Sequence, residues 1–358
     1  MIKKYMILMF FLFLCGLALS SGCAEALTSS KMNPAIAAVG EFEASTSDKA
    51  GLIHPYELLF KGGDIDIYSY VDPYFKAEMV IALSDMQVDF EEAFLESMTL
   101  PAGLKLRIGK FKVPFGKWNT VHEHALPVIT MPLSWERVFG EEGLNESGVA
   151  VSEMLPFLPT YHEIIGLVLN GNNSVAFNGT ATRDLLYMAH LKNFFELGGY
   201  RTLEIGFSYA RGRNNASSNP KLMTNLAGAN LIVQWKHSMF PLERALTLWG
   251  EVYHSRREAM DSTNAIKTQT STGFFVLGKL LFLRRWYATC LYDYSGDPFR
   301  SNECFNSVST GLAFQPSEFS EFKLEYRRVM SNKSGENPVN EFKGMLTFTI
   351  GAHGPHAF

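Results

Sequence analysis

Alternation of apolar and polar residues with a period of two is the feature that most constrains this chain. In 104–111 (LKLRIGKF), 202–210 (TLEIGFSYA) and 321–328 (EFKLEYRR), apolar side chains take every second position, and polar, charged or small ones lie between them. A strand with this pattern has one face against an apolar phase and the other against water. Further segments of the same kind bring the total to about 16 strands. They are 40–45, 64–71, 74–83, 87–97, 147–153, 161–169, 184–192, 228–237, 246–254, 273–282, 285–294, 306–314 and 344–352.

The connections between these segments fall into two classes. Short ones follow most even-numbered strands: 71–73, 100–103, 155–160, 239–244 and 315–318. Long polar ones follow most odd-numbered strands: 45–55, 170–182, 211–226, 256–270 and 330–341, with 84–86 as a short exception. Tight turns at one end and long loops at the other are typical of an outer-membrane barrel with both termini in the periplasm. A soluble sandwich or a propeller could also present such strands, but a propeller needs a repeat of about 40 residues, and we find none.

Composition agrees with a membrane barrel. Aromatic residues make up 13% of the chain, and charged residues make up 19%, which is below the roughly 25% of soluble domains. Lipid offers no hydrogen-bond partner to the backbone, so a sheet in a membrane must close on itself. We therefore predict an all-β fold, a transmembrane antiparallel β-barrel of about 16 strands. The net charge of -4 and the lack of a basic stripe exclude nucleic acid as an expected partner.

The N-terminus has the order of a secretory signal peptide. Lys3 and Lys4 precede an apolar run over 5–19, and Ala24-Glu25-Ala26 follows it. We expect residues 1–26 to be the signal peptide and 27–358 to be the barrel. Cys23 leaves a second interpretation open, a lipidated N-terminus.

The longest connection, 112–144, is the third on the outward side. A loop of this length without strands of its own is usually functional. Either it folds into the lumen and narrows the channel, or it caps the barrel from outside. The candidates for a constriction are Trp118, His122, His124, Trp135, Glu136, Arg137, Glu141 and Glu142.

Charged side chains on the polar faces of the strands are candidates for lining a pore, because rings of charge set ion preference. On simple alternation they are Lys76, Glu78, Lys105, Arg107, Glu204, Lys236, Glu251, Lys279, Lys323, Glu325 and Arg327. Both signs are present, so a solvated lumen without sharp preference is the alternative. Between residues 136 and 142 the long loop has more Glu than Arg or Lys. This charge balance does not favour selectivity for phosphate.

Three further features invite a functional interpretation. His122 and His124 suggest zinc, but two His at i and i+2 on an extended segment should point to opposite sides. No third ligand is evident, so we predict no metal site and no cofactor.

Cys290 and Cys304 are equidistant from Asp297, so a hairpin turning there could hold a cross-strand disulfide. Two unrelated thiols are the alternative. Phe358, as the last residue, fits the terminal aromatic common in outer-membrane barrels, and we expect the barrel assembly machinery to read it.

Several segments of the chain resemble one family. YVDPYFKAEMVIAL (70–83), LPAGLKLRIGKFKVPFG (100–116), FGEEGLNESGVAVS (139–152) and LTFTIGAHGPHAF (346–358) look like Gram-negative outer-membrane proteins related to the phosphate-selective porins. Members are often labelled zinc-regulated TonB-dependent outer membrane receptors. The resemblance runs from about Glu41 to Phe358 and implies a barrel exported through the periplasm into the outer membrane.

The resemblance also implies partners and a function. We expect passive diffusion of small hydrophilic solutes or ions, with outer-membrane lipid as a partner and a homo-oligomer left open. The alternatives are a TonB-dependent, zinc-related receptor and a non-conducting adhesin or scaffold. TonB-dependent receptors resemble one another in having 22 strands and a large N-terminal plug. Only about 14 residues separate Leu27 from the strand at Glu41, which is too few for such a plug, so we expect passive diffusion rather than energised transport. No His-x-Ser pair like that of an outer-membrane phospholipase is present, and we expect no enzyme.

Overall fold

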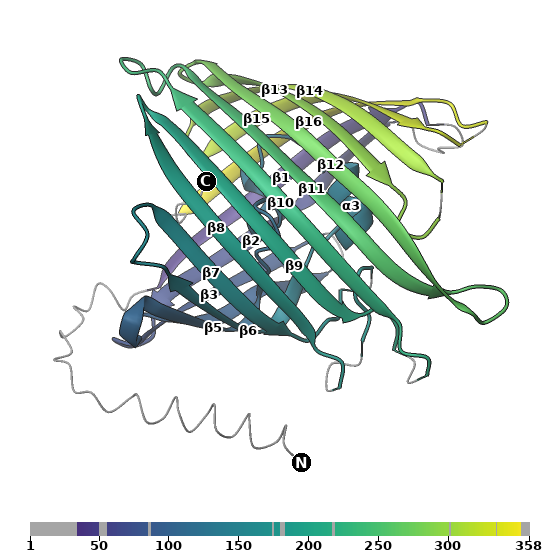
Figure 1. Ribbon diagram of the computed structural model, residues 1–358. Helices are drawn as coiled ribbons and strands as arrows, with labels where there is room; N and C mark the ends of the chain where they lie inside the picture. The colour runs from purple at the N-terminus through teal and green to yellow at the C-terminus, as the bar shows by residue number, and fades with distance from the viewer. Residues whose placement is uncertain are drawn as a thin grey trace.

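The computed structural model describes residues 34–49, 56–84, 87–173, 175–179, 183–216, 219–300, 302–333 and 335–351. In this part of the chain, 16 strands form one closed antiparallel barrel (Figure 1), which confirms the predicted fold class. Each strand pairs with its neighbours in sequence, and β1 closes the ring against β16, from Ala37 opposite Gly351 to Ser47 opposite Glu341. The predicted signal peptide, Cys23 and Phe358 lie outside the described residues.

The strands have the following bounds: β1 (Ala35–Ser47), β2 (Tyr56–Tyr70), β3 (Phe75–Leu83), β4 (Val88–Ser97), β5 (Leu104–Lys112), β6 (Asn145–Met154), β7 (Tyr161–Leu169), β8 (Leu186–Gly198), β9 (Arg201–Arg213), β10 (Met223–Lys236), β11 (Ala245–Met260), β12 (Ile266–Leu283), β13 (Trp286–Gly296), β14 (Cys304–Ser317), β15 (Ser320–Ser331) and β16 (Val339–Gly351). Each of the 16 predicted segments falls on one of them.

The two faces of the wall differ as the alternation predicts. In β12, Phe275 and Leu277 are buried on the inner face, whereas Val276 between them is 49% exposed on the outer face. Leu248 and Leu324 are further large apolar side chains exposed on the outside. A contiguous apolar exterior of this kind is rare on a soluble protein and is the lipid-facing band of a membrane barrel.

Helical segments are few and short in the described chain. They are η1 (Pro101–Gly103), η2 (Trp118–Thr120), η3 (Glu123–Ala125) and α3 (Leu133–Phe139). None has the length and apolarity that a helix needs to cross a membrane. Three of the four belong to the long connection between β5 and β6.

Parts of some predicted long connections are strand. The sequence predicts a loop over 256–270, but β11 continues to Met260 and β12 begins at Ile266, so the turn is only 261–265. The 211–226 connection is shortened in the same way, because β9 continues to Arg213 and β10 begins at Met223. Backbone groups at the loop end of the barrel thus stay paired in the ladder where the side chains are polar.

Of the two interpretations of Cys290 and Cys304, the structure agrees with two unrelated thiols and not with a disulfide. Cys290 and Cys304 are free thiols. In the β13–β14 hairpin, Gly296 lies opposite Cys304 and Cys290 lies opposite Thr310, so the hairpin turns near residue 300 rather than at Asp297. Six positions along a strand separate the two cysteines, about 20 Å, which is well beyond the span of a disulfide.

Candidate functional site

Residues 113–144 lie inside the barrel, as the lumen interpretation of the long connection predicts. The segment leaves the wall between β5 and β6, and Arg137 Nη1 in α3 lies 3.1 Å from Asp297 Oδ2, next to the end of β13. β5 and β13 are eight positions apart in a ring of 16 strands, so the segment reaches across the full width of the lumen. We call residues 113–144 the crossing loop; α3 is seen within the barrel in Figure 1.

One inward carboxylate fastens the first turn of the crossing loop to β11. Glu251 Oε1 accepts hydrogen bonds from the backbone N–H groups of Lys117 (2.9 Å) and Trp118 (2.7 Å) and from the Trp249 indole (2.8 Å). Its Oε2 accepts one from the Tyr253 hydroxyl at 2.6 Å. Glu251 is only 3% exposed, so these bonds replace the hydration that the carboxylate loses.

Gly116 is required for this contact. Its φ is +70°, and its N–H donates to Ser208 Oγ at 3.0 Å. A Cβ at this position would lie 2.1 Å from Glu251 Oε2. The glycine therefore lets the backbone approach the carboxylate, and it adopts a left-handed conformation that other residues rarely take.

Aromatic rings from the crossing loop pack against rings of the barrel wall. The Trp118 ring lies 5.1 Å from that of Trp249 and 5.0 Å from that of Phe275, between centroids. The Phe139 ring of α3 lies 5.7 Å from that of Tyr253. All five side chains are buried, so this side of the lumen is filled rather than open.

A second attachment involves β15. The Lys323 Nζ donates to the carbonyl of Leu126 at 2.7 Å, and Glu325 Oε2 accepts from the backbone N–H of Ile129 at 2.8 Å. Both side chains are buried. Two strand positions thus fix the middle of the crossing loop, one as a donor and one as an acceptor.

The structure places the predicted pore-lining residues in different environments. Glu78, Lys105, Arg107 and Glu204 line a cavity of about 460 Å³ beneath the crossing loop, towards the end of the barrel with short turns. Lys279 lines a second cavity of about 570 Å³ at that end. Glu251, Lys323, Glu325 and Arg327 are instead covered by the crossing loop or by neighbouring side chains. Lys76 pairs with Glu96 at 3.0 Å, and Lys236 is exposed at the end of β10.

The constriction candidates divide in the same way. Trp118 and Trp135 are buried in the aromatic packing, and Glu136 and Arg137 are half-buried in α3. Glu141 and Glu142 are exposed and line a cavity of about 280 Å³ at the end of the barrel with the longer loops. A neighbouring cavity of about 270 Å³ is lined by Glu142 as well.

Acidic side chains predominate around these two loop-end cavities. The carboxylates that line them are Glu41, Asp64, Asp89, Glu91, Glu123, Glu141 and Glu142, whereas the lysines are Lys61, Lys110 and Lys112. Lys112 and Val121 line both the 280 Å³ cavity and the 460 Å³ cavity, so the two adjoin there. Cavities lined by charged side chains therefore lie on both sides of the crossing loop.

His122 and His124 lie differently from what the sequence predicted. The rings are stacked, with centroids 5.6 Å apart and planes 15° apart, because η3 bends the backbone and brings both to one side. His122 Nδ1 lies 3.3 Å from Glu91 Oε2, and its Nε2 lies 3.6 Å from Glu92 Oε2. Burial alone would lower the pKa of His122, but the hydrogen bonds with Glu91 and Glu92 raise it to about 10.

Sequence alternation missed Glu91 and Lys61, because both sit at β-bulges. In the β3–β4 ladder Ile81 pairs with Phe90 and Val80 with Glu92, so Glu91 is an extra residue. Lys61 is the extra residue of β2 in its ladder with β1. Each bulge turns a charged side chain inward. Two adjacent acids in a membrane strand were a usable signal, since strict alternation would leave one of them facing lipid at a cost.

No protein-family model matches the chain. A protein of Aquifex aeolicus, described as uncharacterized, is 28% identical over 353 residues, which cover 89% of this chain and 72% of that protein.

Solved structures resemble the barrel closely in fold. The outer membrane channel DcaP of Acinetobacter baumannii has a TM-score of 0.63 at 12% identity and covers 91% of this chain and all of its own. The anion-selective porin of Comamonas acidovorans has a TM-score of 0.62 at 8% identity, and the match covers 89% of this chain and 99% of that porin. These likenesses confirm the porin-type barrel that the sequence resemblance implied. The narrower labels, phosphate-selective porin and TonB-dependent receptor, stay resemblances.

Proposed function

We propose that this protein is a channel of the Gram-negative outer membrane, through which small hydrophilic solutes or ions diffuse passively past the crossing loop. The observation that carries the proposal is a closed ring of 16 strands with a loop fastened across its lumen and charged cavities on both sides of that loop. An apolar exterior and a polar, hydrated interior are the two conditions for such a channel.

The porin-type neighbours support passive diffusion over energised uptake. Outer-membrane transporters with a plugged lumen have about 22 strands, whereas the described chain closes with 16. Here the lumen is narrowed by the crossing loop, which hydrogen bonds to β11 and β15 hold in place.

We further propose that the channel prefers cations. The long-loop end of the barrel would face the cell exterior, and the cavities at that end have an excess of carboxylates. Acidic side chains at a narrow passage raise the local cation concentration and repel anions. Phosphate selectivity finds no support in this charge distribution.

The test is single-channel recording of the refolded protein in a planar bilayer under a salt gradient. We expect discrete conductance steps and a reversal potential of the sign that cation preference gives. Absence of steps from a sample that is shown to be folded would refute the channel, and a reversal potential of anion sign would refute the preference alone.

A further inference from the structure

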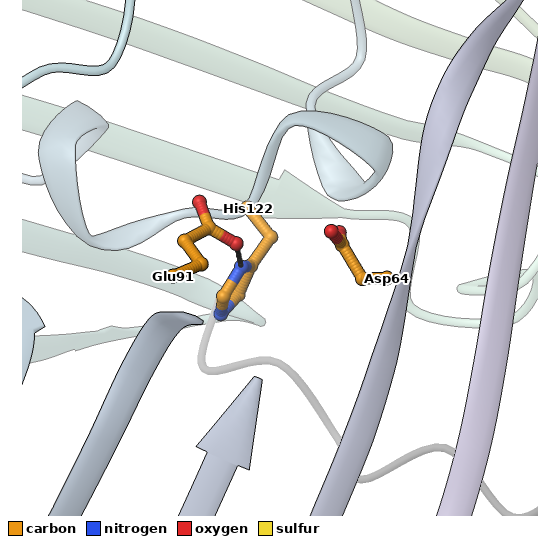
Figure 2. Close-up of side chains that lie close together, drawn as sticks. All are labelled: Asp64, Glu91 and His122. Carbon is orange, nitrogen blue, oxygen red and sulfur yellow. Dashed lines mark hydrogen bonds and ion pairs between the residues drawn. The ribbon is translucent and has the colours of Figure 1, made fainter. Parts of the chain in front are cut away.

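Three side chains from separate segments converge beside the crossing loop. Asp64 comes from β2, Glu91 from β4 and His122 from the loop (Figure 2). One potential ligand atom from each lies within 4.8 Å of the other two. We propose that Asp64, Glu91 and His122 form a binding site for a divalent transition-metal ion, built into the wall of the constriction.

The site has the outer partners that orient metal ligands. His124 Nδ1 lies 3.1 Å from Asp64 Oδ2, and Lys112 Nζ lies 2.6 Å from Glu91 Oε1, the oxygen that does not face His122. Hydrogen bonds of this kind to ligating carboxylates fix their orientation and tune affinity.

The placement of Glu91 is a second, independent feature of the site. A regular ladder would turn Glu91 away from Glu92, yet the bulge in β4 directs both into the lumen. A bulge beside a functional site commonly re-aims one side chain in this way. It is the reason why a strand carboxylate can face His122 at all.

The ligand set determines the class of ion. One imidazole with two carboxylates suits Zn²⁺, Ni²⁺ or Co²⁺, whereas Mg²⁺ and Ca²⁺ prefer oxygen ligands alone. In tetrahedral geometry with bonds of about 2.1 Å, ligand atoms lie about 3.4 Å apart. Because the ligand atoms lie within 4.8 Å of one another, their separations must shorten by up to about 1.4 Å. His122 must also release the proton that it shares with Glu91, and the metal takes the place of that contact.

An ion can reach this site from the long-loop end of the barrel. The 270 Å³ cavity there is lined by Asp64, Glu91 and His124. A bound metal would join β2 and β4 to the crossing loop, so it would also hold the constriction closed. This last consequence rests on the proposed channel function; metal binding itself does not.

The experiment is isothermal titration calorimetry of Zn²⁺ into the untagged full-length protein, refolded in detergent and freed of metal with a chelator that is then removed. We expect one site per chain, and a dissociation constant at least 10-fold lower for Zn²⁺ than for Mg²⁺. Loss of an outer partner typically weakens metal binding by about 10-fold to 100-fold. His124→Ala should therefore weaken Zn²⁺ binding by about 10-fold, and Asp64→Asn, Glu91→Gln and His122→Ala, which remove direct ligands, by at least about 100-fold.

His254→Ala is the matched control, because His254 is exposed on β11 and lies outside the cluster. Asp64→Asn keeps the contacts of His122 with Glu91 and Glu92, so it guards against a variant that fails to fold; circular dichroism checks the strand content of each. Unchanged Zn²⁺ affinity in the folded Asp64→Asn and Glu91→Gln variants would overturn the site. Calorimetry does not require conduction, so failure here is distinct from failure of the channel proposal.

Discussion

The Glu251 carboxylate accepts a hydrogen bond from the backbone N–H of Trp118 at 2.7 Å, which ties β11 to the loop that crosses the lumen. The same oxygen accepts from Lys117 and from the Trp249 indole. Because its other oxygen accepts from the Tyr253 hydroxyl, one side chain satisfies four buried donors, two of them in the crossing loop. Loss of the carboxylate would leave these donors without an acceptor. Each buried group left unpaired lowers the free energy of unfolding by about 1–3 kcal/mol.

Glu251→Ala should loosen the crossing loop. We expect larger and noisier single-channel currents than in the wild type, because the first turn of the loop no longer has an acceptor in the wall. Glu243→Gln, in the exposed β10–β11 turn, is the control and should conduct as the wild type does. If the folded Glu251→Ala variant has the same conductance and the same current noise as the wild type, this contact does not set the constriction.

Trp118→Ala should destabilise the protein. Its ring is 1% exposed and packs on Trp249 and Phe275, so truncation removes a large buried surface and leaves a cavity. Substitutions of this kind cost about 3–5 kcal/mol. Urea unfolding in lipid vesicles measures the change. Phe157→Ala, in an exposed turn, should change the free energy of unfolding by less than about 0.5 kcal/mol.

Neutralising the loop-end carboxylates should weaken cation preference. Asp89→Asn and Glu142→Gln remove two charges from the cavities above the crossing loop. The reversal potential in a salt gradient should shift towards zero, with a larger shift at low salt, where screening is weaker. Glu336→Gln removes one exposed charge in the β15–β16 connection and should leave the reversal potential unchanged. An equal shift in this control would assign the effect to net charge alone.

His122 should make stability depend on pH in alkaline solution. Its pKa is raised to about 10 in the folded protein, against burial, by Glu91 and Glu92, and is near 6.5 when unfolded. The folded state therefore binds the proton more tightly, and the stabilisation is complete below about pH 6.5, declines above it and is lost by about pH 10. The difference in free energy of unfolding between wild type and His122→Ala, measured in chelator, should shrink from pH 6 to pH 10. If the difference in free energy of unfolding stays constant over this pH range, the ion pairs of His122 with Glu91 and Glu92 do not stabilise the fold.

Much of the fold followed from alternation, because a strand between lipid and water must repeat every two residues. That rule located all 16 strands and the third outward loop. It failed where the ladder is irregular: the bulges at Lys61 and Glu91 depend on how two strands pair, which neither strand encodes alone. Strand ends were also missed, since polar residues beyond the membrane alternate weakly.

Less of the candidate site could be predicted. The helix α3 has seven residues, too few to be stable alone, and it forms because Trp135, Val138 and Phe139 are buried in the lumen. The stacking of His122 on His124 follows from η3, a turn without a clear sequence signal. Glu251 was expected to line water, whereas the loop covers it; only the tertiary structure shows that its partners are backbone donors.

The most direct test of the account compares the single-channel conductance of the wild type with that of a variant lacking residues 118–139, both refolded and checked for barrel formation by circular dichroism. If the crossing loop narrows the lumen, the deletion should raise the conductance several-fold and reduce its selectivity. An unchanged conductance in the folded deletion variant would contradict the central claim, since the current would then not pass the loop.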